Sequence, residues 1–509
     1  LLLFKFYFIP FRSTVNKNLI IFIQIILFLI EKNLLISHNI FYYRLINLER
    51  RNNMTRDMTT GSIPKHMLVY AVPLLFGNIF QQLYHTVDSV VVGKYNGKES
   101  LAAIGAAGPI MNILLFIIVG LSMGASILMA EQFGAKDYPR LRRELSTSLI
   151  AGIAFTLVIS VIAVFAAPSF LIWTNTPSDI LEESTRYLRI VSAGMLFSCI
   201  YNVFAAALRS VGDSRTPLFV LIMTSLLNIA LDVWFVGYLG SGLEGAAWAT
   251  IFSQAISSIV LTLYVHLKVP LLRLSKETLK IDFSLLKTTT SYGTTSAVQQ
   301  TVVYLGRVLV QSAVNSLGVD SMAAFNAAFN LDSFAISPGD ALAASVTTIV
   351  AQNRGAKKYD RIPKGFHSGL LIGIFYTLFI AAIVYCFPEI LMGLFLNGGD
   401  INIIQMGSSY LRSMAVFYLA TAFTQTMQGL FRGLGHLNVT LLGSLIQIGI
   451  RVLITYLMIY TLGINAVAIG TGIGWLCMIV YETIVWVRYK RRELSPQENS
   501  EENKEKFKA

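Results

Sequence analysis

The sequence predicts an all-α polytopic membrane protein with twelve transmembrane helices, arranged as two parallel six-helix bundles related by a pseudo-two-fold axis along the membrane normal. The 509 residues are 54% hydrophobic and only 13% charged, and the mean hydropathy is +0.62. Apolar segments of membrane-spanning length recur along most of the chain, which predicts the membrane class. Two halves of the chain also repeat one another, which predicts the pair of bundles.

The apolar segments begin near Lys65. A membrane offers no water to backbone N–H and C=O groups, and no segment shows the alternation of a barrel strand, so we expect each segment to be a helix. The twelve segments are approximately residues 65–92, 101–130, 144–167, 180–207, 216–239, 243–266, 285–316, 320–351, 366–387, 403–430, 437–461 and 464–488.

Basic residues predict the orientation of these helices. They gather in the loops after segments two, four, six and eight, including Lys136, Arg140, Arg209, Arg215, Lys268, Arg273, Lys357 and Arg361. We therefore expect these loops and both termini to face the cytoplasm, in a multi-pass protein of the cell (inner or plasma) membrane. This topology explains the formal charge of +12 without a nucleic-acid partner.

The ends of the chain differ from its apolar body. Residues 1–53 start with Leu1, and their best apolar run, 19–30, is short for a span. We expect a non-native or disordered leader translated from a misplaced start, with a short cytoplasmic extension as the alternative. The expected parts that follow are the first bundle at 54–268, a cytoplasmic linker at 269–283, the second bundle at 284–490 and a disordered tail at 491–509.

The internal repeat has a period near 222 residues. Three short motifs recur in the same order: GAKDY at 134–138 as GAKKY at 355–359, Tyr187-Leu188-Arg189 as Tyr410-Leu411-Arg412, and Arg209 with Gly212 as Arg432 with Gly435. Because each copy holds six spans, the copies share one orientation in the membrane. A route between the two bundles is the natural path for transport.

Polar side chains inside the apolar segments identify a candidate cation site in the first half. Asn228 and Asp232 are four residues apart and share a helical face. An aspartate at the centre of a membrane helix costs about 2.5–3.5 kcal/mol, so we expect it to face a wet interior and bind something. Three more polar side chains lie at a similar depth, roughly 8–12 Å below the outer surface: Asp88, Tyr187 and Thr250.

These five side chains offer oxygen atoms of the kind that suit Na⁺ or a shared proton. The alternative is an internal hydrogen-bond network that only holds helices together.

At these residues the sequence resembles the multidrug and toxic compound extrusion (MATE) family, over about residues 61–490. The resemblance rests on Pro73 followed by VDSVVVG around Asp88, GAKDY at 134–138, LRSVGDSRTP at 208–217, and the spacing of Asn228, Asp232 and Thr250 with GAAWAT.

The resemblance implies a secondary active antiporter that exports organic, often cationic and amphipathic, compounds in exchange for Na⁺ or H⁺ by alternating access. It implies no enzymatic cofactor. In the bacterial branch with the cation site in the N-terminal half, the ligands match Asp88, Asn228, Asp232 and Thr250, with Tyr187 adjacent.

The second half departs from the first at these positions. By the repeat offset, Asn228 corresponds to Arg451 and Asp232 to Thr455. An arginine does not coordinate Na⁺ and effectively never releases its proton, so we expect coupling to reside in the N-terminal half alone. Another branch of the family uses acidic residues in the seventh and tenth spans, and this chain has none there.

Two other classes of protein are alternatives. A lipid-linked oligosaccharide flippase of a related superfamily should have a strongly cationic cavity, for which only Arg307 and Arg451 are available. A membrane enzyme should have a catalytic constellation, but only His85 of the six histidines lies deep in a span. We therefore expect a monomeric, non-enzymatic protein whose partners are a small organic substrate and the bilayer.

Polar stripes on segments one and seven are candidates for the lining of the substrate cavity. They consist of Asn78, Gln81 and His85 on segment one, and of Gln300, Tyr304 and Arg307 on segment seven. Arg307 and Asp332 lie at depths of roughly 15 and 20 Å, and an unpaired arginine there would be costly. We therefore predict an Arg307–Asp332 ion pair, with Asp340 as the alternative partner and snorkelling of Arg307 to water as the alternative interpretation.

Overall fold

The computed structural model describes residues 55–395 and 401–494, together with their side chains except those of residues 83–91, 98, 394–395 and 493–494. The described elements are all helices. They are α2 (Ile63–Gly134), α3 (Tyr138–Trp173), α4 (Ser178–Ser210), α5 (Arg215–Asp232), the π-helical turn η3 (Val233–Tyr238), α6 (Gly242–Lys268), the short η4 (Pro270–Leu272), α7 (Phe283–Asn315), α8 (Val319–Gly355), α9 (Arg361–Cys386), α10 (Pro388–Phe395), α11 (Ile401–Gly433), α12 (Leu437–Leu462), α13 (Asn465–Tyr489) and η5 (Lys490–Leu494).

Helix α2 contains two of the predicted spans. Its backbone leaves helical geometry at Gly97, where φ is 86° and ψ is −173°, a conformation that glycine adopts without the steric cost of a Cβ atom. The segments Ile63–Gln82 and Glu99–Gly134 on either side are each long and apolar enough to cross a membrane.

Ten segments of the described chain meet this criterion of length and apolarity. Helices α7 and α11 are 33 residues each, long enough to span, but richer in polar residues. Together they give the twelve spans that the sequence predicts. The short helix α10 is an addition that the apolar pattern did not predict.

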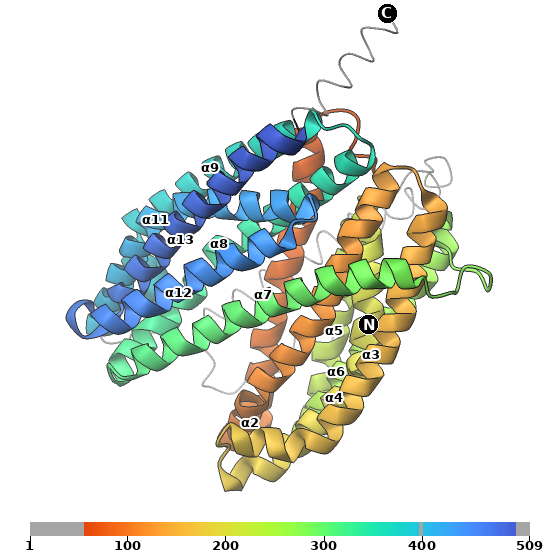
Figure 1. Cartoon of the computed structure of the whole chain (residues 1–509). Coiled ribbons are helices and arrows are strands. Elements are labelled where there is room, and N and C mark those ends of the chain that lie inside the picture. Colours follow the sequence, from red (N-terminus) through yellow and green to blue (C-terminus); the bar gives the residue numbers. More distant parts are fainter. Residues whose placement is uncertain (1–54, 396–400, 495–509) are drawn as a thin grey trace, which may run out of the picture.

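The helices form two bundles, α2–α6 and α7–α13, which meet toward the upper right of Figure 1 and spread apart toward its lower left. Each bundle has its own apolar core. The core of the first includes Met129, Leu145, Phe204 and Leu261, and that of the second includes Val310, Phe325, Tyr410, Ile459 and Val467. The turn between α3 and α4 and the turn between α12 and α13 lie at the spread end.

The repeated motifs adopt the same backbone conformation in both halves. Lys136 and Lys357 are left-handed, with φ of 59° and 58°. Gly212 and Gly435 are likewise left-handed, with φ of 87° and 80°. The sequence repeat is therefore also a repeat of turn geometry, as two copies of one helical unit require.

The bundles approach closely where α2 crosses α7 and α8. Gly120 packs on Ala297 and Gly124 on Gly293, with no room for a side chain at either glycine. Near the ends of α2 and α8, Gly134 packs on the carbonyl of Gln352, and Gly355 on the carbonyl of Glu131. Small residues allow such close backbone approach between membrane helices.

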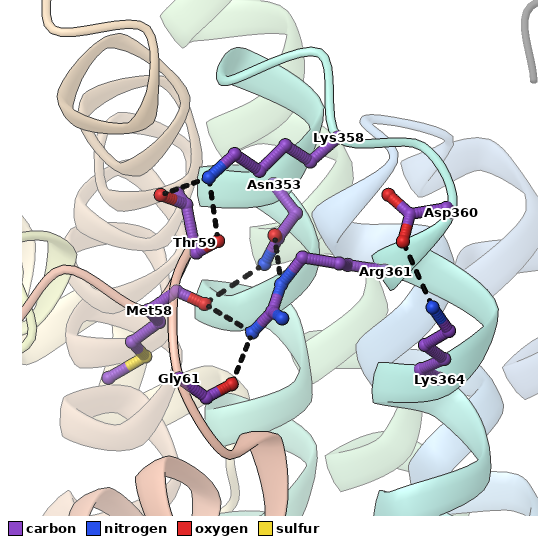
Figure 2. Close-up of polar contacts among 8 residues, drawn as sticks. All are labelled: Met58, Thr59, Gly61, Asn353, Lys358, Asp360, Arg361 and Lys364. Atoms are coloured by element: carbon purple, nitrogen blue, oxygen red, sulfur yellow. Dashed lines mark hydrogen bonds and ion pairs between the residues drawn. The ribbon is translucent and has the colours of Figure 1, made fainter. Parts of the chain in front are cut away.

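A segment before α2, residues 55–62, which we call the strap, joins the bundles at this same end (Figure 2). The Met58 backbone N–H donates to Gln352 Oε1 at 2.9 Å, and Met58 is completely buried. Arg361 of α9 donates to the Gly61 carbonyl at 3.0 Å, and Lys358 Nζ donates to the Thr59 carbonyl at 2.9 Å. The strap therefore ties the start of the first bundle to the second bundle.

Polar contacts between the helices add to this closure. Arg354 of α8 forms an ion pair with Glu131 of α2. Thr348 of α8 donates to the Tyr70 hydroxyl at 2.9 Å, and the Gln352 amide donates to the Ser210 carbonyl at 2.8 Å. The bundles are thus closed against each other at the end where the repeated GAK turns lie.

Candidate cation site and substrate route

The structure brings Asn228, Asp232 and Thr250 together inside the first bundle. Asn228 and Asp232 of α5 are 1% and 0% exposed. With the Asn228 amide oriented so that its nitrogen faces the carboxylate, it donates to Asp232 Oδ2 at 2.9 Å, and its oxygen accepts from the Thr250 backbone N–H at 3.2 Å. The predicted face of α5 is therefore turned toward α6 and away from lipid.

The helix changes its geometry directly after Asp232. Helix α5 ends at this residue, and the chain continues as the π-helical turn Val233–Tyr238. The wider π-turn is uncommon and occurs often at functional sites, because it redirects the side chains on either side of it. Here it lies next to the carboxylate at which we expect cation binding.

Tyr187 lies in the apolar cluster beside this site. Its side chain is 5% exposed, and the cluster also contains Val236 of the π-turn and Leu243 of α6. Val92 belongs to the same cluster, so α2 passes the site as well. Asp88 is part of α2, but its side chain, like that of His85, lies outside the described residues.

The chemistry of the described site suits a monovalent cation or a proton. Its side chains offer a buried carboxylate, an amide and a hydroxyl, all of which are hard oxygen ligands. Among the described side chains, no group of three or more His, Cys, Asp and Glu residues could hold a metal ion.

The residues predicted for the substrate route are partly accessible. Asn78, Gln300 and Tyr304 are half-buried, and Gln81 is exposed. Tyr304 of α7 makes an edge-to-face contact with Phe116 of α2, with ring centroids 5.7 Å apart. This contact places the polar stripe of α7 beside the boundary between the bundles.

The predicted ion pair between Arg307 and Asp332 is wrong. Asp332 is 4% exposed and accepts a hydrogen bond of 2.7 Å from the Tyr418 hydroxyl of α11. Arg307 is exposed, and its guanidinium lies over the Phe329 ring, 4.1 Å from the centroid. The two residues are at compatible depths, but rotation of α8 turns Asp332 into the core of the second bundle.

Asp340 does not replace Asp332 as the partner of Arg307. Its carboxylate accepts from the Gln425 amide at 2.8 Å. Arg451, which occupies the repeat position of Asn228, is the guanidinium whose charge acts on Asp332. The second bundle therefore has its own buried polar centre, built from different residues than the first.

Comparison with known proteins agrees with this geometry. The MatE family model matches residues 73–234 and 296–457, one match in each bundle and offset by 223 residues (296 minus 73). The two matches cover more than half of the chain. The chain belongs to the MatE family. As a MatE protein it is a membrane transporter and not an enzyme.

Several MatE relatives are similar over most of their length. The chain is 28% identical over 351 residues to a probable multidrug resistance protein, YoeA, of Bacillus subtilis, covering 68% of this chain and 76% of the relative. It is 24% identical to a probable multidrug resistance protein, NorM, of Thermotoga maritima, covering 83% of this chain and 90% of the relative.

Solved structures share the MatE fold. One is described as the outward-facing conformation of a multidrug resistance MATE family transporter of the MOP superfamily, with a TM-score of 0.80, 23% identity, and coverage of 87% of this chain and 98% of the other. Another, a MATE in the bent conformation, has a TM-score of 0.80 at 24% identity, covering 87% and 98%.

Two buried carboxylates of this MatE protein are absent from the sequence-based list of sites. Glu482 of α13 is completely buried and accepts from the Gln428 amide at 2.6 Å. Glu144 of α3 is also completely buried and accepts from the Thr289 hydroxyl of α7 at 2.6 Å. An acidic residue alone in an apolar segment was the available signal for Glu482, which lies within 464–488.

Proposed function

We propose that this chain is a secondary active antiporter that exports small organic compounds across the cell membrane in exchange for Na⁺ or H⁺. The observation that carries the proposal is Asp232, a carboxylate with no exposed surface inside a spanning helix, hydrogen-bonded to Asn228. Buried ionisable groups in membrane helices mark ion pathways. The names of the relatives support multidrug compounds as the exported substrates.

In this proposal the coupling ion binds at Asp232 with Asn228 and Thr250, with Asp88 as a further ligand and Tyr187 adjacent. Na⁺ and a proton compete for the same carboxylate oxygens, because each neutralises the same negative charge. Ion binding in the first bundle favours substrate release, and substrate binding favours ion release, since the coupling free energy is reciprocal.

Transport then requires the bundles to close alternately at either end. Residues 54–268 and 284–490 are the two moving units, and 269–283 joins them on the cytoplasmic side. The basic loops after α2 and α8 lie at the closed end, and the positive-inside rule supports our proposal that this is the cytoplasmic end and that the molecule is outward-facing. Opening of this end breaks the contacts of the strap and of the Gly134 and Gly355 crossings.

Asp232→Asn tests the coupling role in proteoliposomes that contain the purified full chain. Loss of a charged ligand reduces the free energy of cation binding by about 1.5–3 kcal/mol, so the apparent cation affinity should fall about 10- to 100-fold. Dye efflux driven by the cation gradient should fall as well. Asp332→Asn is the matched control, because it makes the same change in a carboxylate that is equally buried but lies in the second bundle.

The proposal is contradicted if Asp232→Asn shows normal coupling, or if Asp232→Asn and Asp332→Asn lose coupling equally. The identity of the ion follows from the same assay in the parent chain. If Na⁺ and protons compete, the apparent Na⁺ affinity should rise between about pH 6 and pH 8. A flat profile would contradict competition at this site.

A further inference from the structure

Two guanidinium groups and one carboxylate form a cluster of charged residues at membrane depth in the second bundle. Two guanidinium groups, Arg307 of α7 and Arg451 of α12, act electrostatically on one another. Asp332 is the carboxylate on which the charge of Arg451 acts, and its Oδ1 is occupied by the Tyr418 hydroxyl. Within this cluster of three residues, two positive charges lie near one negative charge.

Arg307 is the accessible member of this group. Its side chain is exposed and, within the described part of the chain, forms neither a hydrogen bond nor an ion pair. Its position, eight residues before the end of α7 at Asn315, is about 12 Å inside that end. Arginine side chains at such depth normally face a water-filled cavity or a partner.

The surroundings of Arg307 indicate which way it faces. It follows Tyr304 by one helical turn, on the stripe that also contains Gln300 and Gln311. Tyr304 contacts Phe116 of the other bundle. Arg307 therefore lies one turn beyond that contact, toward the end where the bundles spread apart (Figure 1).

The lipid-facing sides of α7 are marked by different residues. Leu305 and Leu309, two residues on either side of Arg307 and so on the opposite face of the helix, are 49% and 46% exposed and apolar. The polar stripe lies on the other face of α7 and is unsuited to hydrocarbon. Because Tyr304 of this stripe contacts Phe116 of the first bundle, this face of α7 borders the space between the bundles.

One aromatic ring lies against the guanidinium of Arg307. Arg307 Cζ lies 4.1 Å from the centroid of the Phe329 ring of α8. Such stacking orients the planar group and leaves its N–H donors free for hydrogen bonds in that plane. A guanidinium presented in this way matches the two oxygens of a carboxylate.

We propose that Arg307, stacked on Phe329 and flanked by Tyr304, is a substrate subsite for a carboxylate on an aromatic compound. The proposal rests on the proposed transport function and adds a substrate class to it. The compounds that fit are zwitterionic or anionic, because the accessible guanidinium of Arg307 has no ion-pair partner among the described residues. A simple organic cation gains nothing from this subsite.

A matched pair of dyes tests the proposal. Rhodamine B carries one carboxylate beside its cationic ring system, and its ethyl ester lacks that negative charge. Binding of each to the purified full chain is measured by fluorescence anisotropy, without any ion gradient. The parent chain should bind the acid more tightly than the ester. Arg307→Gln should weaken acid binding about 10- to 100-fold and leave the dissociation constant of the ester nearly unchanged.

Two further variants control for folding and for general loss of charge. Arg307→Lys keeps the charge but not the paired donors, so its affinity for the acid should fall between those of the parent and Arg307→Gln. Arg412→Gln removes an arginine of the same bundle that is already paired with Glu389 at 2.8 Å, and it should bind both dyes like the parent.

The proposal is overturned if the parent chain shows no preference for the acid or binds neither dye. It is also overturned if Arg307→Gln weakens both dyes equally, which is the result expected of an arginine that only snorkels to water. Failure of the antiporter function would be distinguishable, because selective dye binding would then persist while no ion gradient drove efflux.

Discussion

The close crossing of α2 and α8 predicts a strong effect of a single methyl group. Gly355 packs against the backbone carbonyl of Glu131, so the Cβ atom of an alanine there would overlap that carbonyl. A backbone carbonyl cannot swing aside as the end of a long side chain can. The helices must therefore separate, at a cost of about 1–3 kcal/mol.

This cost applies only when the bundles are closed at this end, because the crossing exists only then. The closed conformation of Gly355→Ala should lose population relative to the open one by about 5- to 140-fold, since each 1.4 kcal/mol is a factor of ten. Gly134→Ala should act in the same way, because Gly134 packs on the carbonyl of Gln352 at the symmetry-related place.

The separation can be measured by electron–electron double resonance between spin labels at two exposed positions of the closed end. Arg143 on α3 and Lys364 on α9 lie in different bundles and are suitable after replacement of the three native cysteines. Gly355→Ala should add a population with a longer distance between the labels. Thermal unfolding of the same sample reports whether the variant is folded.

Gly449→Ala is the control, because no atom lies within 4 Å of the position where its Cβ would be. It should leave the distance distribution unchanged. The reasoning is refuted if folded Gly355→Ala keeps the parent distribution, or if Gly449→Ala lengthens the distance equally.

Two further predictions concern the same end of the molecule. Arg361→Ala removes the donor to the Gly61 carbonyl and should speed amide hydrogen exchange in the strap by the equivalent of about 1–3 kcal/mol (Figure 2). The control Lys364→Ala breaks only the exposed ion pair with Asp360 and should leave this exchange unchanged. Equal exchange rates in the two variants would contradict the role of the strap. Asp213, between α4 and α5, accepts from the Thr216 backbone N–H at 3.1 Å, and its burial raises the pKa of its carboxyl. Its stabilising contribution is full below the unfolded pKa of about 3.9 and is lost as pH rises through the folded pKa. As pH rises through the folded pKa, thermal unfolding should therefore show the parent losing stability relative to Asp213→Asn. A stability difference between parent and variant that does not change with pH would refute this prediction.

The helices and their repeat could be predicted from the sequence because both depend on local pattern. An apolar segment of spanning length has one economical conformation in lipid, which is a helix. The shared turns at Lys136 and Lys357 follow from the repeated GAK motif. The proximity of Asn228 to Asp232 also follows locally, since residues four apart share a helical face.

The tertiary structure decided how each helix is rotated. Spacing along the chain predicts depth, because each residue rises 1.5 Å, but it does not predict which neighbour a side chain meets. Arg307 and Asp332 illustrate the difference, since their depths are compatible and yet Asp332 turns to Tyr418 while Arg307 stacks on Phe329.

Hydrogen bonds between residues that are distant in the chain likewise could not be predicted from the sequence. Glu144 is bonded to Thr289, 145 residues away, and Met58 to Gln352, 294 residues away. The sequence by itself determined the membrane class, the helices, the two repeated units and the polar face of α5. The tertiary structure decided the closed end, the strap and the exposed guanidinium, because each depends on which faces of separate helices pack together, and that choice is made by packing over the whole molecule.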